Sequence, residues 1–182
     1  MKINTTGFDG LLIIEPTVFE DSRGYFMESF NSELFRKAGI AFSPVQDNES
    51  KSSKGVIRGL HYQLRPFDQA KLIRVIEGKI MDVAVDIRRT SKTFGKWFSV
   101  ELNAENRRQL FIPRGFAHGF SVLSKTATIQ YKIDNLYRPV SERGIIINDP
   151  SLGIDWKTDL SKAIISEKDL KLPHFNLADN NF

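Results

Sequence analysis

The chain has 182 residues, of which 41% are hydrophobic and 11% aromatic, enough apolar material to form the core of one domain. It contains no cysteine, which excludes disulfides and thiolate chemistry. Its net charge is +4, but the basic residues are spread along the chain and do not form the patch typical of nucleic-acid-binding proteins. No run approaches the roughly 20 apolar residues that span a bilayer, and the N-terminus lacks the apolar core of a signal peptide. We therefore expect a cytoplasmic protein without a nucleic-acid or membrane partner.

Most of the predicted elements are short strands, because turn signals with glycine recur along the chain and the segments between them alternate apolar and polar residues. The clear exception comes early, in NSELFRKAG, where Asn31 or Ser32 can cap a helix and Gly39 can close it. Late in the chain we expect one short helical turn after Ser166, followed by an irregular tail.

The clearest strands are KIMDVAVDIR (79–88) and TATIQYKI (126–133). In the first, one face carries Met81, Val83, Val85 and Ile87, and the other carries Ile80, Asp82, Ala84 and Asp86. In the second, one face carries Ala127, Ile129, Tyr131 and Ile133. Half-buried strands of this kind with little helix predict an all-β antiparallel sandwich or jelly roll, as a single domain over residues 1–182.

Two of the histidines fall in predicted strands, and imidazole serves as base, acid, metal ligand or buried polar group. His61 alternates with Gly59 and Gln63, so it faces a small, polar side that suits a cavity, although a histidine hydrogen-bonded on a sheet face fits equally well. Arg58 has the opposite parity. It shares a site with His61 only if the strand twists or bulges between them.

Three further side chains could face a cavity. Alternation places His118 and Tyr131 inward, where each is either a satisfied core residue or a functional group. Lys71 shares a face with Ile73 and Val75, yet a lysine at the start of a strand is commonly an edge or surface residue. The residue pattern alone leaves these alternatives open.

A metal site is the less favoured reading of the histidines. The position two residues after His61 is Gln63, a poor ligand, which leaves only Glu77 and the distant His118 to join it. Motifs of the form GxSxG, GxxxxGK and GxGxxG are absent, so the usual hydrolase, P-loop and dinucleotide readings have no support. We expect no metal and no cofactor.

Seven segments, in chain order, carry a family resemblance: DSRGYFMESF (21–30), QDNES (46–50), RGLHYQ (58–63), QAKLIRVIEGKIMDVAVDIR (69–88), RRQLFIPRGFAHGF (107–120), YKIDNLY (131–137) and SEKD (166–169). Together they closely resemble the dTDP-4-dehydrorhamnose 3,5-epimerase family. The resemblance implies a cupin-type jelly roll, a homodimer, a dTDP-sugar substrate and chemistry without metal or cofactor. One departure is Glu49, where histidine often stands in the QDNxS segment.

The resemblance also implies roles for single residues. His61 is similar to the base that removes protons at C3 and C5, Asp169 to the carboxylate that orients it, Tyr131 to the donor on the opposite face, and Lys71 to a group that stabilises the enolate. The residues that match substrate-binding positions are Arg23, Glu28, Gln46, Asn48, Arg58, His118, Tyr137, Glu142 and Lys168. Tyr137 matches a ring that the neighbouring subunit contributes and that stacks on the thymine of the substrate.

The implied reaction is an isomerisation. It converts dTDP-4-dehydro-6-deoxy-D-glucose to dTDP-4-dehydro-L-rhamnose through an enolate, within the dTDP-L-rhamnose biosynthesis that supplies lipopolysaccharide O-antigen or cell-wall polysaccharide. An enzyme that inverts only C3 or only C5, or a ketoisomerase on the same fold, is the alternative. A catalytically silent sugar-nucleotide-binding module is a third reading, and the presence of both His61 and Tyr131 argues against it.

Overall fold

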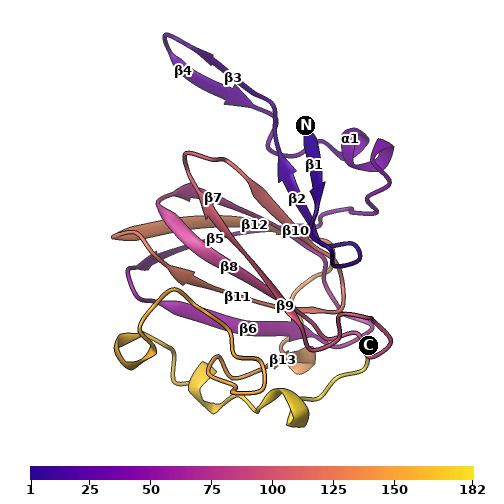
Figure 1. The fold of residues 1–182 in the computed structure, drawn as a ribbon. Coiled ribbons are helices and arrows are strands. Elements are labelled where there is room, and N and C mark those ends of the chain that lie inside the picture. The colour runs from indigo at the N-terminus through magenta and orange to yellow at the C-terminus, as the bar shows by residue number, and fades with distance from the viewer.

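Two antiparallel sheets pack face to face in the computed structural model, which describes residues 1–182 (Figure 1). The six-stranded sheet has the order β1 (Lys2–Thr5), β2 (Leu12–Glu15), β10 (Gln109–Ile112), β7 (Lys71–Glu77), β12 (Thr126–Ile133) and β5 (Gln46–Ser53). The five-stranded sheet has the order β13 (Glu142–Gly144), β6 (Ile57–Gln63), β11 (Phe116–Val122), β8 (Lys79–Asp86) and β9 (Trp97–Asn103). The predicted all-β antiparallel sandwich is confirmed.

A separate hairpin of β3 (Val18–Asp21) and β4 (Gly24–Met27) projects from the side of the six-stranded sheet, away from the five-stranded sheet (Figure 1). The predicted helix is α1 (Ser32–Lys37), whose N-cap Asn31 accepts hydrogen bonds from the backbone N–H groups of Glu33 and Leu34. It is followed by Gly39, whose φ of +74° favours glycine.

The other helical elements are four single 3₁₀ turns: η1 (Pro139–Ser141), η2 (Leu160–Lys162), η3 (Asp169–Lys171) and η4 (Phe175–Leu177). The turn η3 confirms the one expected after Ser166, and η4 lies within the otherwise irregular tail. None of the helices has the length and apolar character needed to cross a membrane.

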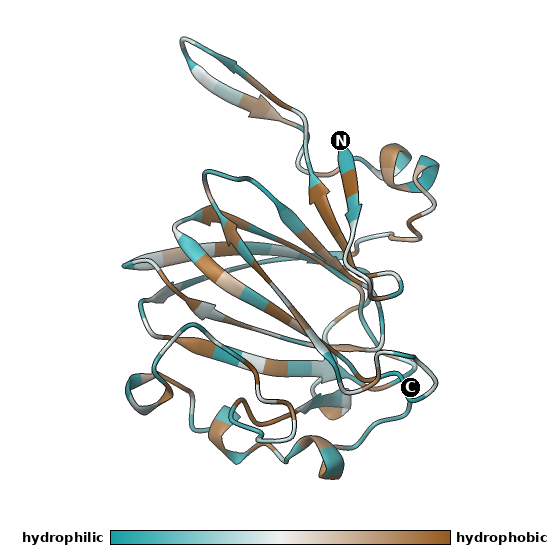
Figure 2. Cartoon of the chain, viewed as in Figure 1, coloured by the Kyte–Doolittle hydropathy of each residue, from teal (hydrophilic) through white to brown (hydrophobic).

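Apolar side chains gather in three clusters, and brown hydrophobic residues alternate with teal ones along the strands in Figure 2. The main cluster fills the space between the sheets and includes Ile73, Ile80, Leu110 and Ile129. A second cluster lies on the outer side of the five-stranded sheet, beneath the C-terminal segment. The third packs α1 against the outer side of the six-stranded sheet.

The strand β8 differs from its prediction in one respect. The two faces are those that the alternation assigned, but the strand is not half-buried, because both faces are covered. Val83 and Val85 pack outward against the C-terminal segment that carries Trp156. The face with Asp82 and Asp86 points between the sheets, and both carboxylates are 0% exposed. The alternation depends only on the residues of the strand itself, so it cannot show that a distant segment covers the outer face of that strand.

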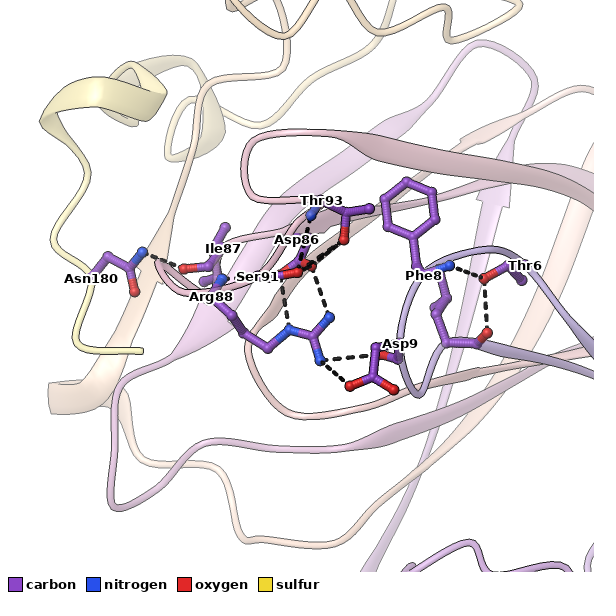
Figure 3. Close-up of polar contacts among 10 residues, drawn as sticks. Thr6, Phe8, Asp9, Asp86, Ile87, Arg88, Ser91, Thr93 and Asn180 are labelled. Carbon is purple, nitrogen blue, oxygen red and sulfur yellow. Dashed lines mark hydrogen bonds and ion pairs between the residues drawn. The ribbon is translucent and has the colours of Figure 1, made fainter.

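Asp86 belongs to a hydrogen-bond network that connects the loop after β8 with the N-terminal loop and the C-terminal tail at one end of the sandwich (Figure 3). Asp86 accepts hydrogen bonds from the Arg88 guanidinium at 2.8 and 2.9 Å and from the hydroxyls of Ser91 and Thr93 at 2.6 Å each. The same guanidinium donates to the backbone carbonyl of Asp9, 3.1 Å away in the N-terminal loop. Beside it, Asn180 of the tail donates to the carbonyl of Ile87 at 2.6 Å.

Candidate active site

A cleft with two lobes opens between the sheets. The first lobe, of about 330 Å³, is lined mainly by polar side chains that include Gln46, Asn48, Gln69, Tyr137 and Glu142. The second lobe, of about 530 Å³, is lined by both polar and apolar side chains that include Arg58, His118, Phe120, Ile129 and Asp169. Three side chains, His61, Lys71 and Tyr131, line both lobes and mark the place where the lobes meet.

His61 on β6 is held by Asp169, whose Oδ1 lies 2.7 Å from the imidazole Nε2. The carboxylate is 4% exposed, its Oδ2 accepts from the backbone N–H of Gly59 at 3.3 Å, and the backbone N–H of Asp169 itself donates to the Ser166 hydroxyl at 3.1 Å. Burial alone raises the pKa of Asp169, but the bonds from His61 and Gly59 bring that pKa below its ordinary value. An ionised Asp169 only accepts, so the Nε2 of His61 donates to it, and Nδ1 is the nitrogen left to exchange a proton with another group.

Arg58 reaches the same cleft because β6 is irregular. Against β11, His118 is opposite His61 and Phe120 is opposite Arg58, so three steps on β6 match two steps on β11. The extra residue reverses the parity of Arg58 and brings its side chain to the cleft, where its Nε donates to the Ser52 hydroxyl at 3.1 Å. The bulge that the sequence analysis required is present.

A second histidine–carboxylate pair stands on the same sheet. The Nε2 of His118 lies 2.7 Å from the Oδ1 of Asp82, and the Oδ2 of Asp82 is buried with no hydrogen-bond partner. His118 therefore points inward, as predicted, and lines the second lobe. The sequence places Asp82 on one face of β8 but does not indicate a role for it. The signal was present, because two carboxylates share one face of a strand that is otherwise apolar.

Lys71 and Tyr131 approach from the opposite wall, since both lie on the six-stranded sheet. Burial lowers the pKa of Lys71 to about 8, against the opposing effect of the negative charges of Asp82 and Glu142. Burial also raises the pKa of Tyr131, which keeps its phenol protonated near neutral pH, and the charge of Arg58 opposes that shift. Lys71 is thus a cleft residue and not a surface one.

A small charged cluster joins two residues of the first lobe, Tyr137 and Glu142, to Lys168 of the second. Tyr137 donates its hydroxyl proton to the Oε2 of Glu142 at 2.9 Å, and the ammonium of Lys168 forms an ion pair with the same oxygen. Burial raises the pKa of Glu142, but its bonds from Lys168 and Tyr137 hold that pKa below the ordinary value. The ion pair in turn raises the pKa of Lys168. In the same lobe, the side-chain amide of Gln46 donates to the Oδ1 of Asn48 at 2.8 Å.

Two of the predicted binding residues lie outside the cleft. Arg23 is at the tip of the hairpin, where its side chain is 88% exposed and pairs with Asp21 at 2.6 Å. Glu28 follows β4 and accepts from the Asn31 amide at 3.0 Å. Neither residue lines either lobe of its own chain. The chain alone therefore does not bring these two residues to the other eleven, and their roles stay predictions.

No three histidine, aspartate or glutamate side chains are grouped as ligands for a metal ion. Each cleft histidine is instead bound to one carboxylate, Asp169 or Asp82. The cleft thus offers a base with a free imidazole nitrogen on one wall, and a protonated phenol and a lysine on the facing wall. Such a set suits proton removal next to a carbonyl group and return of a proton from the other side.

Comparison with known proteins points to one family. A family model described as dTDP-4-dehydrorhamnose 3,5-epimerase matches residues 5–176. The dTDP-4-dehydrorhamnose 3,5-epimerase of Shigella flexneri is 52% identical over 180 residues, which are 98% of each chain.

Two solved structures show how closely the fold agrees. The dTDP-6-deoxy-D-glucose-3,5-epimerase of Legionella pneumophila, in complex with dTDP-4-keto-L-rhamnose, superposes with a TM-score of 0.93 at 48% identity, covering 98% of this chain and 94% of that one. A more distant structure is ChmJ, a 3'-monoepimerase from Streptomyces bikiniensis in complex with dTDP-quinovose. It superposes with a TM-score of 0.88 at 34% identity, covering 94% and 86%.

Proposed function

The chain belongs to the dTDP-4-dehydrorhamnose 3,5-epimerase family, whose reaction inverts C3 and C5 of dTDP-4-dehydro-6-deoxy-D-glucose, and we propose how its cleft carries out that reaction. The observation that supports the proposal is the placement of His61 and Tyr131 on opposite sheets around one cleft. Inversion needs one group to remove a proton from one side of the sugar and another to return it from the other side. Two facing walls satisfy that requirement.

We propose that His61 is the base. The C4 ketone of the substrate acidifies the C–H bonds at C3 and C5, and the Nδ1 of His61 is free to accept a proton while Asp169 holds Nε2. The ionised Asp169 stabilises the imidazolium that forms. A positioned general base of this kind contributes about 10²–10⁴-fold to the rate.

Loss of the proton places negative charge on the ketone oxygen, which needs a fixed cation or hydrogen-bond donor. Lys71 supplies the cation, and His118, whose Nε2 is held by Asp82, lines the cleft on the facing sheet. A preorganised donor at such an oxyanion is worth about 3 kcal/mol. Tyr131 then returns a proton to the carbon. Proton removal and return involve no net oxidation, so we propose that the reaction uses neither metal nor cofactor.

The nucleotide end of the substrate is assigned to the charged and amide groups around the cleft. Arg58 and Lys168 suit the diphosphate, because guanidinium and ammonium groups make charge-assisted hydrogen bonds with its oxygens. Gln46 and Asn48 offer amide donors and acceptors for the nucleobase, and Tyr137 offers a 47% exposed ring that can stack on a nucleobase. Glu142 orients Tyr137 and Lys168 toward this end.

We further propose that the active form is a homodimer in which the hairpin enters the cleft of the partner. Phe19 and Phe26 on the hairpin are 61% and 66% exposed and stack on each other, and a contiguous exposed apolar pair of this kind favours a partner surface. This arrangement would bring Arg23 and Glu28, which lie outside their own cleft, to a second active site. The absence of cysteine and the dTDP-sugar substrate are compatible with a cytoplasmic enzyme.

The second candidate is a mono-epimerase, favoured by the similarity to the 3'-monoepimerase fold. Incubation of the enzyme with dTDP-4-dehydro-6-deoxy-D-glucose in heavy water separates the two. We expect deuterium at both C3 and C5 of the product, with the ketone still at C4. Label at one carbon only would contradict double epimerisation, and a ketone that has moved to C3 would indicate a ketoisomerase.

A further inference from the structure

Apolar side chains are distributed unevenly between the two lobes of the cleft. The first lobe has one aliphatic side chain, Ile133, and its other apolar groups are tyrosine rings. The second lobe is lined by Phe120 and by five aliphatic side chains, which are Val56, Ile57, Ile129, Ile164 and Ile165. The groups assigned to proton transfer and to the nucleotide do not account for this apolar part of the second lobe.

Strand register places two of these apolar side chains next to reactive ones. On the six-stranded sheet, Ile129 precedes Tyr131 by two residues on β12, and both side chains line the second lobe. On the facing sheet, Phe120 follows His118 by two residues on β11, and both of these also line the second lobe. Two residues of a strand span roughly 6.8 Å, so each apolar side chain lies one step along its wall from a reactive one.

The two steps run in the same direction. The turn at residues 123–125 joins β11 to β12, and Phe120 and Ile129 are both nearer to that turn than His118 and Tyr131 are. Phe120 and Ile129 belong to the same apolar cluster and are almost fully buried, with 6% and 1% of their surface exposed. The two side chains thus form one apolar layer across the cleft, next to the layer of His118 and Tyr131.

The reacting sugar has one apolar substituent that suits such a layer. Its ring carries hydroxyl groups at C2 and C3, the ketone at C4, and a methyl group, C6, on C5. Because C5 is one of the two carbons that exchange a proton with His61 and Tyr131, its methyl group is held one bond away from the reacting atoms. The thymine ring also has a methyl group, but the deoxyribose and the diphosphate separate it from the sugar by much more than one step along a strand.

We propose that Ile129 and Phe120 bind the C6 methyl group and thereby select 6-deoxy sugars over sugars with a hydroxyl group at C6. Inversion at C5 exchanges the positions of the hydrogen and the methyl group, so the methyl group moves from one face of the ring to the other. The apolar layer has one residue on each wall. It therefore holds the methyl group before and after inversion, while the proton is removed and returned beside it.

A hydroxyl group at C6 would lose its hydrogen bonds to water on entering the apolar layer. Two polar side chains are next to the layer in register: Ser50 lies opposite Ile129 on β5, and Arg58 lies opposite Phe120 on β6. Arg58 is assigned to the diphosphate, so Ser50 is the group that offers such a hydroxyl a partner. Since an apolar pocket rejects an added hydroxyl group by at most about 100-fold, we expect a preference of about tenfold for the 6-deoxy sugar.

The test is calorimetric titration with two stable ligands, dTDP-6-deoxyglucose and dTDP-glucose, which differ only at C6. Neither ligand has a ketone at C4, so neither reacts. Ile129→Thr should reduce the preference for the 6-deoxy ligand to about threefold or less, because it adds a hydroxyl group to the layer. Ile129→Val should keep the preference, since valine has the shape of threonine without the hydroxyl group.

Ile133→Thr is the matched control. Ile133 lies on the same strand as Ile129 and is 2% exposed, but it lines only the first lobe. The same substitution there should leave the preference unchanged. Equal loss of the preference in Ile129→Thr and Ile133→Thr would contradict the assignment to the apolar layer, because the effect would then not depend on the lobe.

This inference rests on the proposed epimerase reaction, and the wild type distinguishes the two. A wild-type protein that binds neither ligand contradicts the proposed function itself. A wild-type protein that binds both ligands equally well contradicts the methyl subsite and leaves the proposed function standing. If Ile129→Thr fails to fold by circular dichroism, Ser50→Ala replaces it and should raise the preference at least about threefold, since the hydroxyl of dTDP-glucose then has no partner. An unchanged preference in Ser50→Ala would contradict the inference.

Discussion

Asp82 and Asp86 lie four residues apart on the same face of β8, and both are fully buried, yet their surroundings differ completely. Asp86 receives hydrogen bonds from Arg88, Ser91 and Thr93, all in the loop that follows β8, and Arg88 also bonds to the N-terminal loop (Figure 3). Asp82 is bound only by His118, and its second oxygen has no partner. One carboxylate therefore lies in the hydrogen-bond network of Asp86, Arg88, Ser91 and Thr93 at one end of the sandwich, which we call the closed end, and the other lies at the cleft.

The difference shows that burial does not by itself indicate the role of a carboxylate. A buried carboxylate whose oxygens are all bonded stabilises the fold, because its charge is balanced where it stands. A buried carboxylate with one histidine partner beside a cavity leaves its charge available to that histidine and to the substrate. We therefore expect substitutions at the cleft to affect catalysis and substitutions at the closed end to affect stability.

The largest effect is expected at the cleft. His61→Ala should reduce kcat by about 10³-fold, because it removes the base, and should leave the melting temperature nearly unchanged. Steady-state kinetics together with thermal unfolding measure both quantities. His174→Ala, in the exposed part of the tail, is the control and should keep full activity. A variant at His61 that loses its activity only because it unfolds would contradict the separation of the two regions.

The next largest effect is expected at the closed end. Asp86→Asn should lower the free energy of unfolding by about 2–3 kcal/mol, since Arg88 loses its charged partner, while the folded enzyme keeps its kcat. Denaturant unfolding and kinetics at low temperature check both parts. A substantial fall in kcat without loss of stability would show that this network also serves the reaction.

The same carboxylate predicts a pH dependence of stability. Burial alone raises the pKa of Asp86, but the bonds from Arg88, Ser91 and Thr93 bring that pKa below its ordinary value. Its stabilising contribution is therefore complete above a pH of about 4 and is lost as the pH falls through the lowered pKa. The melting temperatures of the wild type and Asp86→Asn should converge in acid. A constant difference across that range would contradict the assignment.

A smaller effect is expected from the matching change at the cleft. Asp82→Asn should lower kcat by about 10–100-fold, the equivalent of one charge-assisted hydrogen bond of about 1.5–3 kcal/mol, because His118 loses the group that orients it. Stability should change much less than in Asp86→Asn, since Asp82 has one partner in place of three. Equal destabilisation by the two substitutions would remove the contrast between the two ends.

The smallest expected effect is a shift in the pH profile. Burial lowers the pKa of Lys71 to about 8, and the reaction needs its protonated form, so kcat/KM should fall as the pH rises above that value. Lys71→Arg keeps the charge at all accessible pH values, and its profile should lose the alkaline decline even if its overall rate is lower. An alkaline decline that persists in this variant would assign it to another group.

Local pattern predicted much of the fold and part of the cleft. Alternation identified the strands and the inward positions of His118 and Tyr131, and capping chemistry identified α1, because both depend only on neighbouring residues. Alternation failed at Arg58, since one extra residue on β6 reverses every parity beyond it. That displacement depends on pairing with β11, which the local sequence does not encode.

Other parts of the cleft depend on contacts between distant segments. His61 and Asp169 are separated by 108 positions, and only the family resemblance had joined them. Lys71 could not be distinguished from a surface lysine, because its exposure depends on which strands lie on each side of β7. Asp82 was seen as a polar residue in an apolar strand, yet its partner His118 is supplied by another strand.

The central claim is that protons leave to His61 on one wall and return from Tyr131 on the other. Tyr131→Phe tests it most directly, when loss of substrate protons to heavy water and formation of inverted product are measured in the same reaction. We predict that proton exchange survives while inversion falls by at least about 100-fold, because the base is intact and the donor is absent. Equal loss of exchange and inversion would contradict the account, since a single group would then serve both faces of the sugar.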